Sequence, residues 1–135
     1  MKALETILYS TLAGDGTLMG YLPGGLHNTL VESPVGAYMV FQKVSAVPVG
    51  YTLRLLEGEI YLYQFRIIAK GASKAGILDA LDRLRVLLNL QTLVVGAHTF
   101  WRMTWEGDMP DLLGLDDDGV PLLQIGATYR IELGV

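Results

Sequence analysis

The sequence contains no cysteine, which excludes disulfide bonds, thiolate metal sites and cysteine nucleophiles. Charge is also scarce, because only 18% of the 135 residues are charged, against about 25% in a typical soluble domain. Hydrophobic residues account for 51% of the chain. Since so much apolar surface has to be covered by something, we expect the protein to self-associate or to bind a large partner surface.

Long hydrophobic runs are absent as well. No apolar stretch reaches the ~18 residues that span a bilayer, because Arg, Asp or Gly interrupts each candidate. The N-terminal stretch MKALETILYSTLAGDG carries Glu5 and lacks the basic region and small-residue cleavage site of a secretion signal. We therefore expect it to belong to the mature protein, with no membrane partner.

Basic residues do not gather anywhere in the sequence. The formal net charge is −4, and no cluster of Lys and Arg is visible. Because phosphate contacts come from such clusters, the composition argues against a general nucleic-acid-binding protein.

The hydrophobic pattern predicts helices at two places and strands between and after them. In chain order we expect a helix over residues 3–13, a short strand over 26–31, a strand over 37–45, a projecting hairpin or flap over 46–58, a strand over 59–71 and a helix over 73–88. Two further strands follow, HTFWRMTWEG and PLLQIGATYRIELGV, joined by the polar, turn-rich segment DMPDLLGLDDDG.

Alternating apolar positions mark the buried faces of these strands. The expected core positions are Tyr61, Tyr63, Phe65, Ile67 and Ala69 in one strand, Trp101, Met103 and Trp105 in the next, and Leu123, Ile125, Ala127, Tyr129, Ile131 and Leu133 in the last. In the second helix the expected buried stripe is Ile77, Leu81, Leu84 and Leu88, widened by Leu78 and Leu87. The order predicts one α+β domain over residues 1–135, in which two helices pack on a mainly antiparallel sheet.

One short motif has the glycine spacing of a nucleotide-binding loop but lacks the residues that follow those glycines. Gly71 and Gly76 in FRIIAKGASKAG have the spacing of the glycines in a phosphate-binding loop. That motif needs Lys and then Ser or Thr after the second glycine, where this sequence has Ile77 and Leu78 in the expected helix stripe. We therefore interpret the stretch as a turn from a strand into a helix.

Metal and catalytic patterns are equally weak. Asp116, Asp117 and Asp118 are consecutive, whereas a calcium loop places its acids at alternate positions, so a solvated hairpin turn is the favoured interpretation. His27 and His98 have no partner at metal-ligand spacing. No nucleophile elbow is present, and the acid pairs Glu57 with Glu59 and Glu106 with Asp108 occur where strands end in loops. We expect no catalytic residue, no metal and no cofactor.

The expected flap leaves two interpretations open. Its apolar residues, in a segment too short and too rich in glycine for a core of its own, are Val49, Tyr51, Leu53, Leu55 and Leu56. The segment is either an ordinary hairpin that folds back on the sheet, or an arm that docks on a neighbouring subunit through apolar contacts or strand addition.

The layout also resembles a known family. The features that carry the resemblance are the N-terminal helix in MKALETILYSTLAGDGTL, the strand YMVFQKVS, and the strand ending FRIIAKG that leads directly into the helix SKAGILDALDRLRVLL. Together with the paired C-terminal strands, this arrangement is similar to the tail terminator, or tail-completion, proteins of long-tailed bacteriophages. The resemblance covers nearly the whole chain.

The resemblance implies a structural virion protein without enzymatic activity. It implies a homohexameric ring at the head-proximal end of the tail, assembled in the bacterial cytoplasm, that caps the tail tube protein, stops its polymerisation and meets the head-completion proteins of the neck. DNA would pass through such a ring without specific binding, so we expect an acidic cluster such as Asp116–Asp118 to lie at the lumen or its rim, where it repels phosphate. The alternatives are a neck or head-completion connector and a small α+β ligand-binding domain or enzyme.

Overall fold

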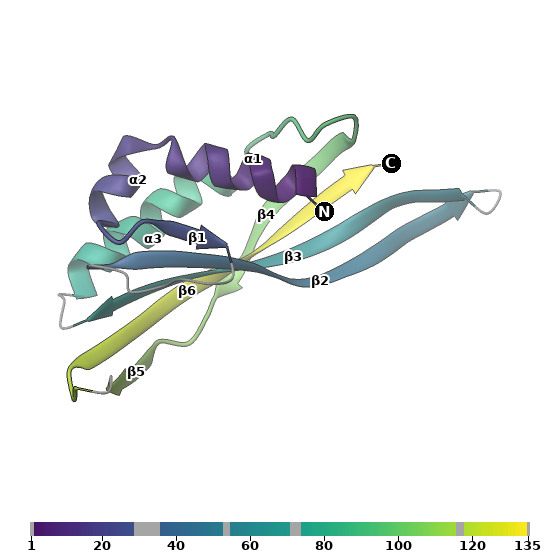
Figure 1. The fold of residues 1–135 in the computed structure, drawn as a ribbon. Helices are drawn as coiled ribbons and strands as arrows, with labels where there is room; N and C mark the ends of the chain where they lie inside the picture. Colours follow the sequence, from purple (N-terminus) through teal and green to yellow (C-terminus); the bar gives the residue numbers. More distant parts are fainter. Residues whose placement is uncertain (1, 29–35, 53–54, 71–73, 116–117, 135) are drawn as a thin grey trace.

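A computed structural model describes residues 2–28, 36–52, 55–70, 74–115 and 118–134, except for the side chains of residues 49–52, 55–57 and 74–75. Three helices and six strands follow one another in this part of the chain (Figure 1). They are α1 (Lys2–Ala13), α2 (Gly16–Tyr21), β1 (Leu26–Asn28), β2 (Tyr38–Thr52), β3 (Leu55–Lys70), α3 (Lys74–Leu88), β4 (Thr99–Asp108), β5 (Leu112–Leu115) and β6 (Pro121–Gly134).

The strands form one sheet in the order β1-β2-β3-β6-β4, and β5 pairs with β6 beside this path. All pairings are antiparallel except the short parallel contact of β1 with β2. The three helices lie over one face of the sheet, and within the described residues the other face carries no helix (Figure 1). The predicted α+β class with a mainly antiparallel sheet is therefore confirmed.

The core forms where the helices meet this sheet. Alternation along β3 buries the five predicted residues from Tyr61 to Ala69, and β6 buries every second residue from Ile125 to Leu133. From the helices, Leu4, Leu8 and Leu12 of α1 and five residues of α3 reach the same core. The four buried residues of α3 that the stripe predicted are Ile77, Leu81, Leu84 and Leu88. Leu87 is half-buried against the core, whereas Leu78 is exposed, so the stripe is narrower than expected.

The helix count differs from the expectation of two, because α2 forms in the glycine-rich stretch between the expected helix over 3–13 and the expected strand over 26–31. Asp15 caps this helix: its carboxylate accepts a hydrogen bond of 2.8 Å from the amide of Leu18. The same carboxylate accepts two hydrogen bonds from Arg83 of α3, of 2.9 and 2.7 Å. These hydrogen bonds lower the pKa of Asp15. Because Leu18 is fully buried, the cap and the ion pair together hold α2 on the core.

The expectation for β4 is wrong at both tryptophans. Trp101 and Trp105 are 46% and 37% exposed, and only Met103 is buried as predicted. The pairing of β4 with β6 shifts register between Phe100 and Arg102 and again between Trp105 and Gly107. A strand with such bulges no longer alternates strictly between the two faces of the sheet, so a simple odd-even pattern fails here.

The expected flap is the distal part of a hairpin that is longer than the sequence indicated. β2 and β3 pair from Tyr38 with Ile68 out to Thr52 with Leu55. Among the described residues, the neighbouring strand β6 pairs with β3 as far as Gly58, which lies opposite Gly134. The end of the β2–β3 hairpin therefore extends past the rest of the sheet (Figure 1). We call residues 46–58, without the undescribed 53–54, the arm.

Candidate assembly surfaces

The arm places four of the five predicted flap residues on backbone that projects from the sheet. Val49, Tyr51, Leu55 and Leu56 belong to the paired strands, but their side chains are not among the described ones. Leu53 lies outside the described residues. Nearer the sheet, Val47 is 52% exposed. The geometry is that of a projecting hairpin.

The β5–β6 hairpin, which adjoins the predicted acidic cluster, lies at the opposite end of the sheet from the arm (Figure 1). Asp116 and Asp117 lie outside the described residues, and Asp118 is exposed in the turn between β5 and β6. The charge asymmetry extends well beyond this turn. Between Arg102 and Arg130 the sequence holds six of its 14 acidic residues and none of its 10 basic residues.

The strand beside this turn was missed, because DMPDLLGLDDDG was interpreted as a polar loop. β5 occupies its centre and pairs with β6 from Leu112 opposite Gln124 to Leu115 opposite Pro121. All four residues of β5 are exposed, with Leu112 at 49%, Leu113 at 78% and Leu115 at 70%. The short apolar run LLGL was the available signal. We call β5, the turn and the start of β6 (residues 112–124, without 116–117) the acidic hairpin.

The helix-free face of the sheet carries a row of ion pairs. Arg102 donates hydrogen bonds of 2.9 and 3.2 Å to Glu132, and Arg130 lies 3.0 Å from the same carboxylate. The hydrogen bonds from Arg102 lower the pKa of Glu132. On this face a shallow groove of about 270 Å³ is lined by Ser45, Val47, Ile60, Leu62, Glu106 and Arg130. Mixed apolar and paired charged groups of this kind suit contact with protein.

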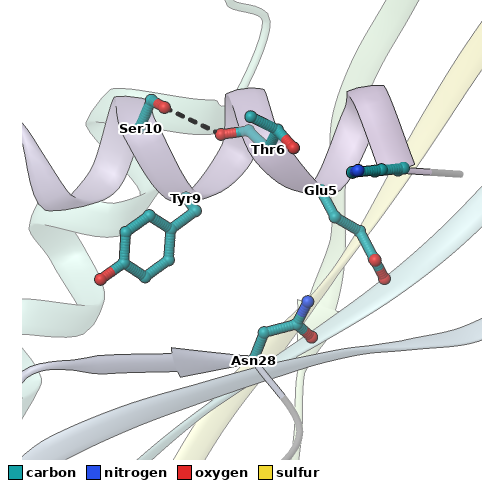
Figure 2. A pocket seen from close by; sticks show the side chains of 6 residues that line it. Glu5, Thr6, Tyr9, Ser10 and Asn28 are labelled. Carbon is teal, nitrogen blue, oxygen red and sulfur yellow. Dashed lines mark hydrogen bonds between the residues drawn. The ribbon is translucent and has the colours of Figure 1, made fainter.

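A second groove, of about 300 Å³, lies between α1 and the end of β1. Figure 2 shows Glu5 and Tyr9 of α1 reaching toward Asn28 of β1 on either side of the hollow. Ser10 donates its hydroxyl hydrogen to the backbone oxygen of Thr6 on the same helix, 2.9 Å away. The hydroxyl of Tyr63 donates to Glu5 over 3.3 Å. Burial raises the pKa of Tyr63, so that hydroxyl stays protonated at neutral pH.

Four of the residues considered for metal binding or catalysis, His27, His98, Glu59 and Asp108, have hydrogen-bonding partners elsewhere. The imidazole Nε2 of His27 lies 2.8 Å from the Gly24 carbonyl oxygen, and Nδ1 of His98 lies 3.3 Å from that of Gly134. Glu59 accepts a hydrogen bond from Tyr61, and Asp108 accepts one from the indole of Trp105. Within the described ranges, no group of three or more His, Asp or Glu residues is placed to hold a metal ion. In the same part of the chain, no helix combines the length and hydropathy of a membrane span.

Comparison with known proteins identifies the fold but not the family. No protein-family model matches the sequence, and no curated protein sequence matches it either. Among solved structures, the chain is similar to one in a structure described as the virion of a native gene transfer agent particle. That match has a TM-score of 0.79 and 14% sequence identity, and it covers 99% of this chain and 96% of the other. At such low identity, the likeness establishes that the two chains share a fold.

Proposed function

We propose that the protein is a structural component of a phage-type virion, a tail terminator that forms a ring on the head-proximal end of the tail tube. The observation that carries the proposal is the likeness to a virion chain over nearly the full length of both proteins. The sequence resemblance to tail terminators supports the same role. In this role the protein has no catalytic activity, and it acts through contacts with itself, with the tail tube protein and with the head-completion protein of the neck.

Ring formation is supported by two different surfaces, the arm and the acidic hairpin, at opposite ends of one sheet. A ring built from identical subunits uses heterologous contacts, in which one surface of each copy meets a different surface of the next. The arm and the acidic hairpin are two such surfaces, and each lies away from the helices (Figure 1). We propose a homohexamer, in keeping with the resemblance.

The acidic hairpin has a proposed role in the passage of DNA. A conduit that attracted phosphate would retain the genome, because each Lys or Arg contact adds salt-dependent binding. The segment between Arg102 and Arg130 carries only acidic charges. We propose that Asp116, Asp117 and Asp118 line the lumen or its rim, so that DNA passes without specific binding.

A binding experiment separates a terminator from a connector of the neck. The purified protein is mixed in parallel with preassembled tail tubes and with DNA-filled, tail-less heads of the same phage, and each mixture is sedimented. A terminator co-sediments with the tubes at the stoichiometry of one ring for each tube. Binding to the heads alone identifies a connector and contradicts the terminator proposal.

A further inference from the structure

The indole of Trp101 lies across two glycines at the base of the arm. Trp101 is the residue that the first register shift of β4 leaves without a partner in β6. A Cβ atom on Gly134 of β6 would lie 2.9 Å from the indole Nε1, and one on Gly58 of β3 would lie 2.5 Å from Cη2. The side chain therefore starts on β4, crosses β6 with its pyrrole ring and reaches β3 with its benzene ring. By alternation from Ile60 and Arg130, which line the groove there, this is the helix-free face.

The close approach of the indole explains why glycine stands at these two positions. Neither Gly58 nor Gly134 has the positive φ that favours glycine over other residues. Glycine weakens the interior of a strand, and it occurs there where another group approaches closely. At Gly58 the approaching groups are the indole and the Leu133 carbonyl oxygen, whereas at Gly134 the three nearest atoms belong to the side chains of Trp101 and Thr99. A side chain at either glycine would lift the ring from the sheet.

The base of the arm is irregular on its other strand. The pairing of β2 with β3 shifts register between Lys43 and Ser45. Pro48, which lies opposite Glu59, has no amide hydrogen to donate. A bulge bends its strand, and a two-stranded hairpin is only marginally stable by itself. The indole bridges β4, β6 and β3 at this point, so it stiffens the arm where the arm leaves the sheet.

A small change of direction at the base becomes a large displacement further out. From Gly58 to Leu55 the strand rises by about 10 Å, so a rotation by about 20°, the size of ordinary strand twist, would move Leu55 by about 3–4 Å. The core of a protein interface is packed as densely as a protein interior, so it does not tolerate such a shift. The direction of the arm therefore matters to any contact that the arm makes.

We propose that Trp101 is a positioning residue for assembly, whose indole holds the arm in the direction in which it docks on the next copy of the ring. This proposal rests on the proposed function, because it takes the arm as one of the surfaces that join the subunits. Trp101 acts through the arm, and its seat is built from the two glycines.

Distances between two spin labels measure the direction of the arm, and the absence of cysteine allows labelling at chosen sites. One label is placed at T52C in the arm and the other at D79C, an exposed position of α3. Double electron–electron resonance is recorded at a concentration where the chain is monomeric. We expect one narrow distribution of distances in the natural background, which W101A broadens by about 3–4 Å.

The matched control is W105A, which removes the other tryptophan of the same strand. Trp105 is 37% exposed, compared with 46% for Trp101. Its indole lies 4.0 Å from the Arg85 guanidinium and donates a hydrogen bond to Asp108, and it has no place among the nearest atoms of the two glycines. W105A should therefore leave the label distances unchanged.

A second variant, G134A, displaces the indole without removing it. The added Cβ would lie 2.9 Å from the indole Nε1 and 3.1 Å from the Cβ of Thr99, and both are side-chain atoms. We expect G134A to broaden the label distances in the natural background. In W101A it should add no further broadening, because no ring is left to displace.

Analytical ultracentrifugation of the unlabelled chain, with and without tail tubes, gives the readout for assembly. W101A should raise the concentration for half-association at least about tenfold, because a displaced arm loses packed contacts. W105A should leave that concentration within about twofold. Both variants should unfold cooperatively, at temperatures above that of the assay.

Several outcomes would overturn the inference. Unchanged label distances in W101A, or equal broadening in W105A, would refute the positioning of the arm by Trp101. Weaker association of W101A with unchanged label distances would show that Trp101 contacts the next copy directly. Rings formed by W101A as readily as by the natural chain would refute its role in assembly and leave the proposed function intact. A natural chain that stays monomeric at every concentration, with and without tail tubes, would refute ring formation and the assembly role of Trp101 together, while the label distances would still decide whether the indole holds the arm.

Discussion

Replacement of Gly58 by alanine should destabilise the protein at the root of the arm. Gly58 lies in the last described rung between β3 and β6, opposite Gly134. A Cβ atom there would lie 2.4 Å from the Leu133 carbonyl oxygen and 2.5 Å from Cη2 of the Trp101 indole. Both distances are too short for carbon, and one neighbour is backbone, so the strands would have to move apart.

The expected magnitude follows from two opposing effects. Overpacking of this kind costs about 1–3 kcal/mol, and the lower entropy of alanine in the unfolded chain offsets about 0.4–1 kcal/mol of that cost. We expect G58A to lower the free energy of unfolding by roughly 1–2 kcal/mol, which corresponds to a fall in Tm of about 3–8 °C for a chain of this size. Urea denaturation and calorimetry of the monomer measure the two quantities.

A second glycine in the same sheet provides the control. Gly114 of β5 has no atom within 4 Å of an added Cβ, so G114A should be neutral or slightly stabilising. The double variant G58A/W101A removes the clash with the indole but keeps the clash with the backbone. Its loss of unfolding free energy should therefore be smaller than the sum of the losses in the two single variants. A G58A variant as stable as the natural chain, or an equal loss in G114A, would refute the packing described for the arm root.

Three further predictions concern the arm, the helix cap and the acidic turn. Replacing Leu53 and Leu55 together by Asp should abolish ring or tube assembly while the monomer unfolds as cooperatively as the natural chain; loss of cooperative unfolding would instead place the arm in the core. Because the hydrogen bonds from Arg83 lower the pKa of Asp15 below its usual 3.8, the stabilising effect of the carboxylate is present above that pH and is lost as the pH falls through the pKa in the folded state. Urea titrations should therefore show D15N less stable than the natural chain at pH 6, with the gap closing below about pH 4; a gap that does not depend on pH would contradict this. Replacing residues 116–118 by Lys should slow DNA ejection from assembled particles and add salt-dependent DNA binding to isolated rings, and an unchanged ejection rate would remove this turn from the DNA path.

Periodicity in the sequence predicted the long elements in which apolar residues recur at a regular strand or helix spacing. The alternating residues of β3 and β6 face the helices as expected, and the stripe of α3 from Ile77 to Leu88 is buried. These elements are long, so local pattern and tertiary packing agree over many residues. The hairpin of β2 and β3 was also expected, but both strands continue through the expected flap, past Pro48, Gly50 and Gly58. Strand pairing tolerates both residue types where the edge is free.

The predictions that were wrong or incomplete concern elements whose local structure is determined by a tertiary contact. α2 is only six residues long and depends on Asp15. The second partner of Asp15 is Arg83 of α3, which is 68 residues away in the sequence. Trp101 leaves the expected face because bulges shift the register of β4, and it packs beside Gly58 and Gly134 instead. No local pattern contains either contact.

The candidate surfaces were predictable only in part for the same reason. The arm was visible in the sequence as an apolar segment bounded by glycines, whereas β5 was hidden among acids and turn residues. A four-residue strand has too few positions for a periodic signal. Its partner β6 is what establishes it as a strand.

The most direct test of the proposed role is to image tail tubes that polymerise with and without this protein. Tail tube subunits are allowed to assemble on baseplates, the protein is added at a defined time, and the tubes are examined by cryo-electron microscopy. We predict that elongation stops on addition, and that each tube carries at its free end a single ring of six copies. Tubes that continue to grow, or ends that carry no ring, would contradict the proposal that this protein is a tail terminator.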